Sequence, residues 1–199
     1  MQKTLSPQRR SQGERTDATR AALVSAARAL FEARGFAATG TPEIVAAANV
    51  TRGALYHHFT DKTELFHAVA RQVAQEVADE IAQRSRHQPK PVDALQAGAQ
   101  AYFAAMAEAG RARLLLLEAP AVLSAEQVLG LSDLAGFQAL QEGLQNALKE
   151  RPEAVLPLRE LSVLLSAAFD RAALAIARGE PAEPYERAVR LLLSRLVPV

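Results

Sequence analysis

Apolar residues recur with the spacing of an α-helix along most of the chain, and no stretch keeps the strict alternation that predicts a β-strand. The first helix is predicted to begin at a cap formed by Thr16 or Asp17 and to end at Gly35. Its apolar face carries Leu23, Ala27, Leu30 and Phe31. The pattern therefore predicts an all-α fold.

Two short helices are predicted next, over residues 41–48 and 52–58. Pro42 has the fixed φ that suits the first turn of the earlier one. Asn49 stands between them, where Asn tolerates the left-handed backbone conformation that ends many helices. Thr51 is a good N-cap for the second. The pattern thus predicts a helix, a sharp turn and another helix.

A longer helix follows, and Asp61 with Glu64 forms its predicted capping box. Its apolar positions are Leu65, Ala68, Val69, Val73 and Val77. After the break at Pro89 and Pro91, further helices are predicted over residues 93–109, 111–118, 125–130, 133–150, 158–178 and 184–197. We expect an N-terminal three-helix bundle followed by a helical domain over residues 63–199.

Charge is distributed unevenly between these parts. Residues 1–62 hold nine basic and five acidic groups, whereas the remainder holds 14 basic and 17 acidic groups. Residues 1–15 are polar and lack periodicity, so we expect them to form a flexible basic arm. The basic N-terminal unit, which comprises this arm and the bundle over residues 16–62, indicates a polyanionic partner such as nucleic acid.

The two short helices have the length and turn chemistry of a helix-turn-helix, over about residues 40–59. Such a motif places the first residues of its second helix against base edges in the major groove. Arg52 has donors for guanine, and Gly53 and Ala54 leave room for close approach. The predicted DNA-binding residues, including hydroxyl, imidazole and ammonium donors for phosphates, are Thr39, Thr41, Thr51, Arg52, Gly53, Ala54, Tyr56, His57 and Lys62.

This region resembles the DNA-binding domain of the TetR family of bacterial transcriptional regulators. The resemblance rests on the runs 35–39, 43–50, 51–59 and 61–66. Asn49 replaces the Gly that the family has in the turn, and Gly40 replaces the Ser or Thr cap of the first motif helix, which weakens that cap or shifts it to Thr41. The resemblance implies a homodimer whose C-terminal helices bind a small effector.

Two sets of residues in the C-terminal part suit these implied roles. Small residues interleaved with leucines favour close helix packing at a dimer interface formed by Leu161, Leu164, Leu165, Ala168, Ala172, Val189, Leu192 and Leu193. The predicted effector pocket comprises Phe103, Met106, Arg113, Leu116, Phe137 and Leu140. From the residues alone, the first set is equally consistent with the core of a single protomer, and residues like those of the second set are more often ordinary core. Since few charged groups interrupt these helices, a mostly apolar effector is expected.

The sequence contains few signals for a metal site, a catalytic site or a membrane segment. Glu64 and His67 form a single Glu-x-x-His pair, whereas a di-iron bundle needs two, so we predict no metal site. No catalytic constellation or phosphate-binding loop is present, which predicts a protein that is not an enzyme and has no cofactor. The chain has no Cys, no apolar run of about 18 residues and a polar N-terminus, so we expect no membrane partner and a cytoplasmic location.

The sequence therefore predicts a homodimeric regulator that binds a palindromic double-stranded DNA operator. We expect a repressor released by a small, mostly apolar effector. Two alternatives remain open: a helical small-molecule-binding protein with weak, non-selective DNA affinity, and a regulator controlled by a protein partner.

Overall fold

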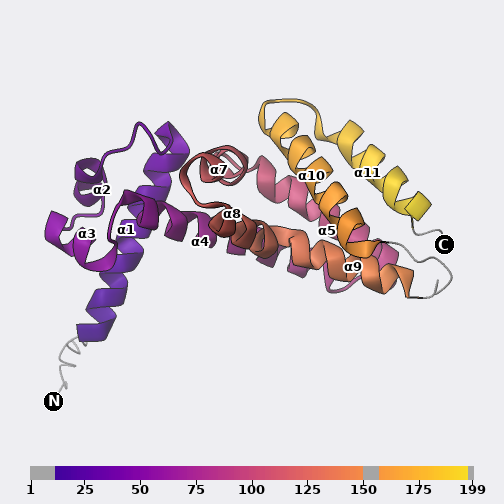
Figure 1. Ribbon diagram of the computed structural model, residues 1–199, viewed down its shortest axis with the longest axis horizontal. Helices are drawn as coiled ribbons and strands as arrows, with labels where there is room; N and C mark the ends of the chain where they lie inside the picture. The colour runs from indigo at the N-terminus through magenta and orange to yellow at the C-terminus, as the bar shows by residue number, and fades with distance from the viewer. Residues whose placement is uncertain (1–11, 150–156, 197–199) are drawn as a thin grey trace, which may run out of the picture. The chain divides into compact units, whose positions relative to one another are not determined.

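The computed structural model describes residues 12–149 and 157–196, which form helices and connecting turns without a β-strand (Figure 1). The all-α prediction is confirmed. The chain divides into two units after Val69, within the long helix α4 (Lys62–Ser85), rather than at residue 62 as the charge pattern suggested. The first turns of α4 belong with the N-terminal unit because Leu65, Phe66 and Val69 are fully buried there.

The N-terminal unit comprises α1 (Gln12–Arg34), α2 (Thr41–Ala47), α3 (Arg52–His58) and the first turns of α4. Helix α1 begins before the predicted cap at Thr16 or Asp17, so residues 12–15 are helical and do not belong to an arm. Glu14 in the first turn favours this earlier start, since a carboxylate there complements the helix dipole. The rest of the predicted arm lies outside the described residues.

Three aromatic rings form the centre of the N-terminal unit. The ring of Phe66 packs edge-on against Phe31 and Phe36, at centroid distances of 5.3 and 5.1 Å. Phe31 and Phe66 are 1% and 0% exposed. Edge-to-face pairs of this kind add to the free energy gained by burying the rings. The cluster fixes α1 and the start of α4 beneath the two short helices.

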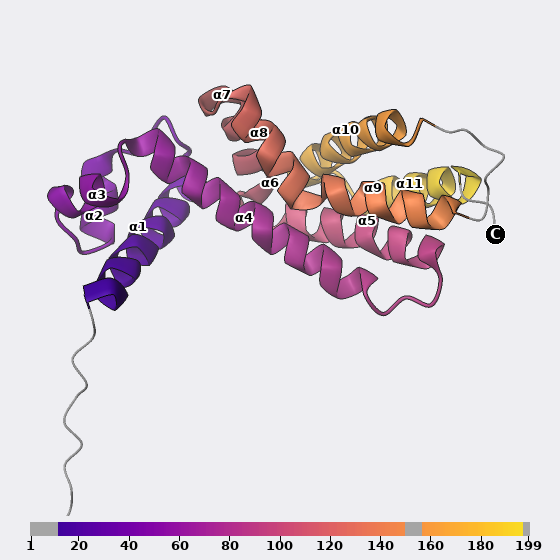
Figure 2. The same ribbon diagram turned by 60° about the horizontal axis from the view of Figure 1, so that its bottom comes forward.

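In the C-terminal unit, α5 (Pro91–Ala107) packs against α9, α10 and α11 (Figure 2). The other elements of this unit are α6 (Arg111–Arg113), η1 (Leu114–Glu118), α7 (Ala119–Val122), α8 (Ala125–Ser132), η2 (Asp133–Phe137), α9 (Gln138–Leu148), α10 (Leu158–Ala177) and α11 (Ala182–Leu196). The core includes Phe103, Met106 and Leu193, each 2% exposed or less. Helix α5 is therefore the central element of the unit.

The elements η1 and η2 connect neighbouring α-helices: η1 is a wide π-helical turn, and η2 is a kink at which two helices meet. Pro120 follows η1 and has no N–H for a helical hydrogen bond, while its ring crowds the carbonyl one turn back, so a wider turn relieves the clash. In η2, Gly136 has φ 146°, which a residue with a side chain rarely adopts. Single π turns within helices are frequently found at functional sites.

Candidate nucleic-acid interface and ligand cavity

The turn between α2 and α3 is built by Asn49, which has φ 53°. The N–H groups of Asn49 and Val50 donate to Ala46 O and Val45 O, at 3.1 and 3.0 Å. These bonds satisfy the last carbonyls of α2 while the left-handed residue reverses the chain direction. The predicted conformation of Asn49 is confirmed, and it fixes where α3 begins.

The short helices are capped in different ways. Thr51 Oγ1 accepts from Ala54 N at 3.1 Å, as expected for an N-cap of α3. The N-cap of α2 is Gly40, so the cap does not shift to Thr41. In place of a side-chain cap, Glu43 Oε2 accepts from Gly40 N at 2.9 Å. This hydrogen bond, together with a second one that the Arg34 side chain donates to Glu43, holds the pKa of the Glu43 carboxyl below its usual value.

An exposed polar cluster joins the starts of α2 and α3. Arg52 lies over the ring of Tyr56, with 5.5 Å from Cζ to the ring centroid. The neighbouring side chains of Arg52 and Thr41 hold the pKa of the Tyr56 phenol below its usual value. Tyr56 is 44% exposed, so the cluster faces solvent. It brings an arginine, a phenol and a hydroxyl together at the N-terminus of α3.

The structure separates the predicted DNA-binding residues into exposed and buried groups. Thr51, Arg52, Gly53, Tyr56 and His57 are exposed, and Thr41, Ala54 and Lys62 are partly exposed. Thr39 is 1% exposed, and its hydroxyl donates to Gly35 O at 2.8 Å. The prediction that Thr39 contacts phosphate is therefore not supported: its hydroxyl closes the turn after α1.

Gly53 occupies a position that the fold itself does not require to be glycine. A Cβ built there has Thr51 Oγ1 as its nearest neighbour, at 3.9 Å, which is ordinary van der Waals contact. Glycine in a helix also costs roughly 0.5–1 kcal/mol relative to alanine. Since nothing in the unit repays this cost, the absence of a side chain fits close approach by an external partner.

Lys62 has partners inside the N-terminal unit. Its Nζ donates to Phe36 O and Thr39 O, at 2.9 and 3.0 Å, and lies 4.0 Å from the centroid of the Phe36 ring. The ammonium thus joins the start of α4 to the loop between α1 and α2. This geometry supports a stabilising role for Lys62 instead of the predicted phosphate contact.

We expect Lys62→Ala to lower the free energy of unfolding of the N-terminal unit by about 1–3 kcal/mol, since charge-assisted hydrogen bonds and a cation–π contact are lost together. Thermal unfolding measures the loss, and the exposed Arg15→Ala is the matched control. The slope of DNA affinity against salt concentration should not change. Unchanged stability with a slope smaller by about one would instead identify a phosphate contact.

A cavity of about 590 Å³ lies within the C-terminal unit. Its walls come from α4, α5, η1, α7, α8, η2, α9 and α10, so both η1 and η2 contribute to it. The volume lies in the range of sites for small organic molecules. Gly136 of η2 lines the cavity, and a Cβ there would meet Ile81 Cδ1 at 3.0 Å. The elements η1 and η2, with this glycine, therefore shape the cavity wall.

Four of the six predicted pocket residues line this cavity: Met106, Leu116, Phe137 and Leu140. The prediction is wrong for the other two. Phe103 is 2% exposed and belongs to the core near α11. Arg113 is not among the lining residues, because its Nε lies 3.2 Å from Glu118 Oε1 in an ion pair.

The sequence analysis missed the polar pair inside the cavity. Tyr102 of α5 donates to Asp170 of α10, with 2.5 Å between Oη and Oδ1. Burial raises the pKa of Asp170, and it raises the pKa of Tyr102 well above its usual value. A signal was present in the chain, since Asp170 interrupts the apolar run 161–177.

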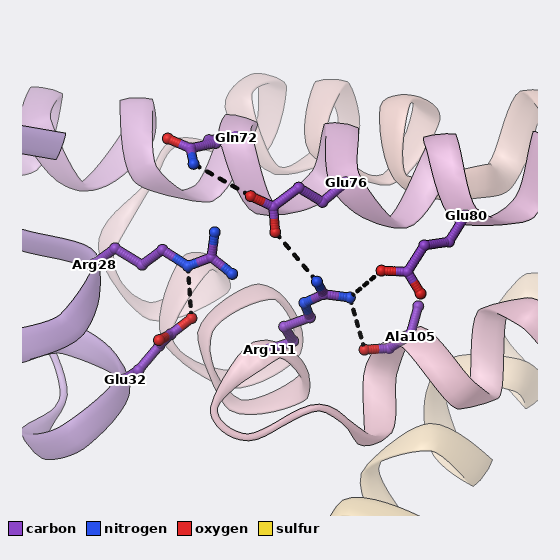
Figure 3. Close-up of polar contacts among 7 residues, drawn as sticks. All are labelled: Arg28, Glu32, Gln72, Glu76, Glu80, Ala105 and Arg111. Atoms are coloured by element: carbon purple, nitrogen blue, oxygen red, sulfur yellow. Dashed lines mark hydrogen bonds and ion pairs between the residues drawn. The ribbon is translucent and has the colours of Figure 1, made fainter. Parts of the chain in front are cut away.

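Arg111 joins the cavity wall to α4 within the C-terminal unit. Figure 3 shows its guanidinium between two carboxylates of α4, 3.2 Å from Glu76 and 2.7 Å from Glu80, with a further bond to Ala105 O. The Arg111 side chain is 11% exposed. The ion pairs hold the start of α6 and η1 against the helix that carries Ile81 into the cavity.

Helices α10 and α11 each bury one face in their own unit and expose another. Of the predicted interface residues, Leu165, Ala172, Val189 and Leu193 are buried within the protomer. They belong to the core, which corrects that half of the prediction. Leu164 and Leu192 are 69% and 50% exposed, Ala168 is exposed and Leu161 partly exposed. Val163 and Leu191, which the prediction omitted, are 45% and 58% exposed.

Residues 12–149 and 157–196 contain neither a cluster of metal-ligating side chains nor a helix that could cross a membrane. No group of three or more His, Asp or Glu side chains is arranged to hold a metal ion there. None of the helices in this part of the chain has the length and apolar character needed to cross a membrane.

Known families match both units of the chain. Residues 23–69 match the family described as bacterial regulatory proteins, tetR family. Residues 92–198 match the family described as tetracyclin repressor-like, C-terminal domain. The first match contains the α2–α3 motif, and the second begins at the start of α5.

Individual proteins give similar results. A probable acrEF/envCD operon repressor of Escherichia coli K12 is 50% identical over 48 residues, which are 24% of this chain and 22% of the repressor. Such matches span only 22% to 38% of the length of the curated relatives. A TetR-family regulator from Pectobacterium atrosepticum has a solved structure with a TM-score of 0.74 and 28% identity, covering 96% of this chain and 99% of that one. RolR bound to resorcinol shares the fold, with a TM-score of 0.70, 18% identity and coverage of 94% and 91%.

Proposed function

The chain belongs to the TetR family of bacterial regulatory proteins, and from this we propose that it is a dimeric transcriptional repressor released from its operator by a small molecule. The observation that carries the proposal is the exposed helix-turn-helix in one unit together with a cavity in the other. Each part supplies one half of a ligand-controlled switch.

The DNA contacts proposed for each protomer centre on the N-terminus of α3. Arg52 reads a guanine through O6 and N7, and Gly53 lets the helix approach the groove floor. Thr41, Thr51, Tyr56 and His57 contact phosphates, which fix the register of the helix without reading bases. The stacking of Arg52 on Tyr56 supports this arrangement, because it orients the guanidinium before DNA arrives.

The partner in the proposed dimer is a second copy of this chain. Val163, Leu164, Leu191 and Leu192 form an exposed apolar face on α10 and α11, and Ala168 leaves space between the larger side chains. An apolar surface of this kind favours protein association over exposure to water. Two such faces related by a twofold axis bury each other, and the same symmetry requires a palindromic operator.

The proposed release mechanism uses α4, which starts in the N-terminal unit and lines the cavity with Ile81, Ala82 and Ser85. An effector that displaces η1 also displaces Arg111. The ion pairs of Arg111 with Glu76 and Glu80 transmit this displacement to α4. The DNA-competent arrangement then loses population, because the effector binds the other one more tightly. The structure of RolR with resorcinol supports a ligand of modest size in this fold.

The proposed base contact is tested with Arg52→Ala. We expect the variant to remain dimeric and to lose roughly 1–3 kcal/mol of discrimination between its operator and a scrambled duplex, because the guanine loses its bidentate partner. Fluorescence anisotropy titrations of both duplexes measure the ratio. Arg15→Ala, which removes an exposed arginine from α1, is the control. An unchanged ratio for Arg52→Ala would assign base reading to other residues.

A further inference from the structure

The charged groups lining the cavity are of one sign. Asp170 and Glu142 line it, and no Lys, Arg or His does so among the residues that the structure describes. The remaining polar groups of the wall are neutral, among them Tyr102, Asn146 and Ser166. A ligand in this cavity therefore meets a negative potential without a compensating positive side chain.

Asp170 is half-buried, whereas Glu142 is exposed. The Oδ1 of Asp170 accepts from Tyr102 Oη at 2.5 Å. A carboxylate has about four acceptor sites, and this bond uses one of them. Burial raises the pKa of Asp170, and the Tyr102 bond opposes the shift. The remaining acceptor sites are ones that a bound molecule can use.

Aromatic rings surround the same space. Tyr102, Phe137 and Phe169 line the cavity, and the rings of Tyr102 and Phe169 lie 6.4 Å apart at an angle of 35°. The faces of aromatic rings attract cations, and the attraction grows when the cation is removed from water. The Asp170 carboxylate and the aromatic rings therefore both favour a cationic group.

We propose that the effector is an organic cation with an apolar or aromatic body, a protonated amine or a quaternary ammonium, whose charge lies against Asp170. This deepens the proposed function and rests on its assignment of the cavity to an effector. An anionic ligand would face two carboxylates, and a neutral apolar ligand would leave the Asp170 charge without a partner. Asp170 and Tyr102 are thus the residues that determine specificity.

The test uses three fluorescent probes with one rod-shaped body: neutral diphenylhexatriene, its trimethylammonium derivative and its propionic acid derivative. Each is titrated into the full-length protein, and the rise in fluorescence in an apolar site reports binding. We expect the cationic probe to bind the wild-type protein about tenfold or more tightly than the anionic one. This comparison requires no variant.

Asp170→Asn then isolates the charge, because the amide oxygen still accepts from Tyr102. We expect the affinity of the cationic probe to fall by about tenfold or more, while that of the neutral probe changes by less than about twofold. The apo variant should unfold at the same or a higher temperature, since a neutral amide replaces a half-buried carboxylate. Glu142→Gln is the matched control: it removes the exposed carboxylate of the wall and should have a smaller effect.

The outcomes distinguish a failure of the cationic effector from a failure of the effector cavity itself. Equal binding of the three probes, or an Asp170→Asn variant that binds the cation as the wild type does, would overturn the cationic effector and leave the effector cavity standing. If none of the probes binds, the cavity is not an effector site, and both proposals fail.

Discussion

Leu164→Glu is expected to convert the dimer to monomers and to weaken operator binding by about 10²- to 10⁴-fold. The side chain is 69% exposed in the protomer, so a carboxylate is tolerated there until a second copy covers it. Burying that charge in an apolar interface is strongly unfavourable. A dimer holds its second head near the second half-site, and this gain in effective concentration is lost in a monomer. Sedimentation velocity and operator titrations measure the two effects.

The matched control for this experiment is Leu117→Glu. Leu117 is 42% exposed and lies on η1 of the same unit, which is not part of α10 or α11. We expect this variant to remain dimeric and to keep its operator affinity. If Leu164→Glu also remains dimeric at the concentrations of the wild type, the interface does not include the exposed face of α10.

Phe66→Ala is expected to destabilise the N-terminal unit by about 3–5 kcal/mol, as for other large aromatic side chains removed from a core. The fully buried ring contacts Phe31 and Phe36, so its loss leaves a cavity between α1 and α4. The total stability of a unit of this size is only about 3–9 kcal/mol. DNA binding should therefore be largely lost. Amide hydrogen exchange should rise across α1, α2 and α3, while α5 and α10 stay protected.

Phe103→Ala provides the comparison, because the same substitution at a site that is 2% exposed removes a ring from the core of the other unit. Exchange should then rise in α5 and α10. Protected amides in α1, α2 and α3 of Phe66→Ala, together with unchanged DNA affinity, would show that the aromatic cluster does not hold the helix-turn-helix in place.

Local chemistry explains why the DNA-binding unit was largely predictable. Asn49 and Thr51 act through their own backbone and side-chain preferences, and both have the conformations that the sequence predicts. Contacts between distant residues were less predictable. Nothing near Thr39 indicates that its hydroxyl is buried, and nothing near Lys62 indicates that its ammonium donates to carbonyls in the preceding loop.

The C-terminal unit shows the same limit more clearly. Helical periodicity identifies the apolar faces of α10 and α11 but does not say whether the same protomer or a second copy covers them. The structure assigns Leu165 and Leu193 to the core and exposes Leu164 and Leu192. The pair of Tyr102 and Asp170 is separated by 68 positions, so only the fold brings these groups together.

The most direct test of the central claim is selection of bound duplexes from a random DNA pool by the full-length protein at physiological salt, read by sequencing. Two helix-turn-helix heads in a symmetric dimer should enrich a palindrome whose half-sites lie about one helical turn, or 10 base pairs, apart. Enrichment of a single half-site without symmetry would contradict the dimer, and recovery of an unselected pool would contradict sequence-specific binding by this chain.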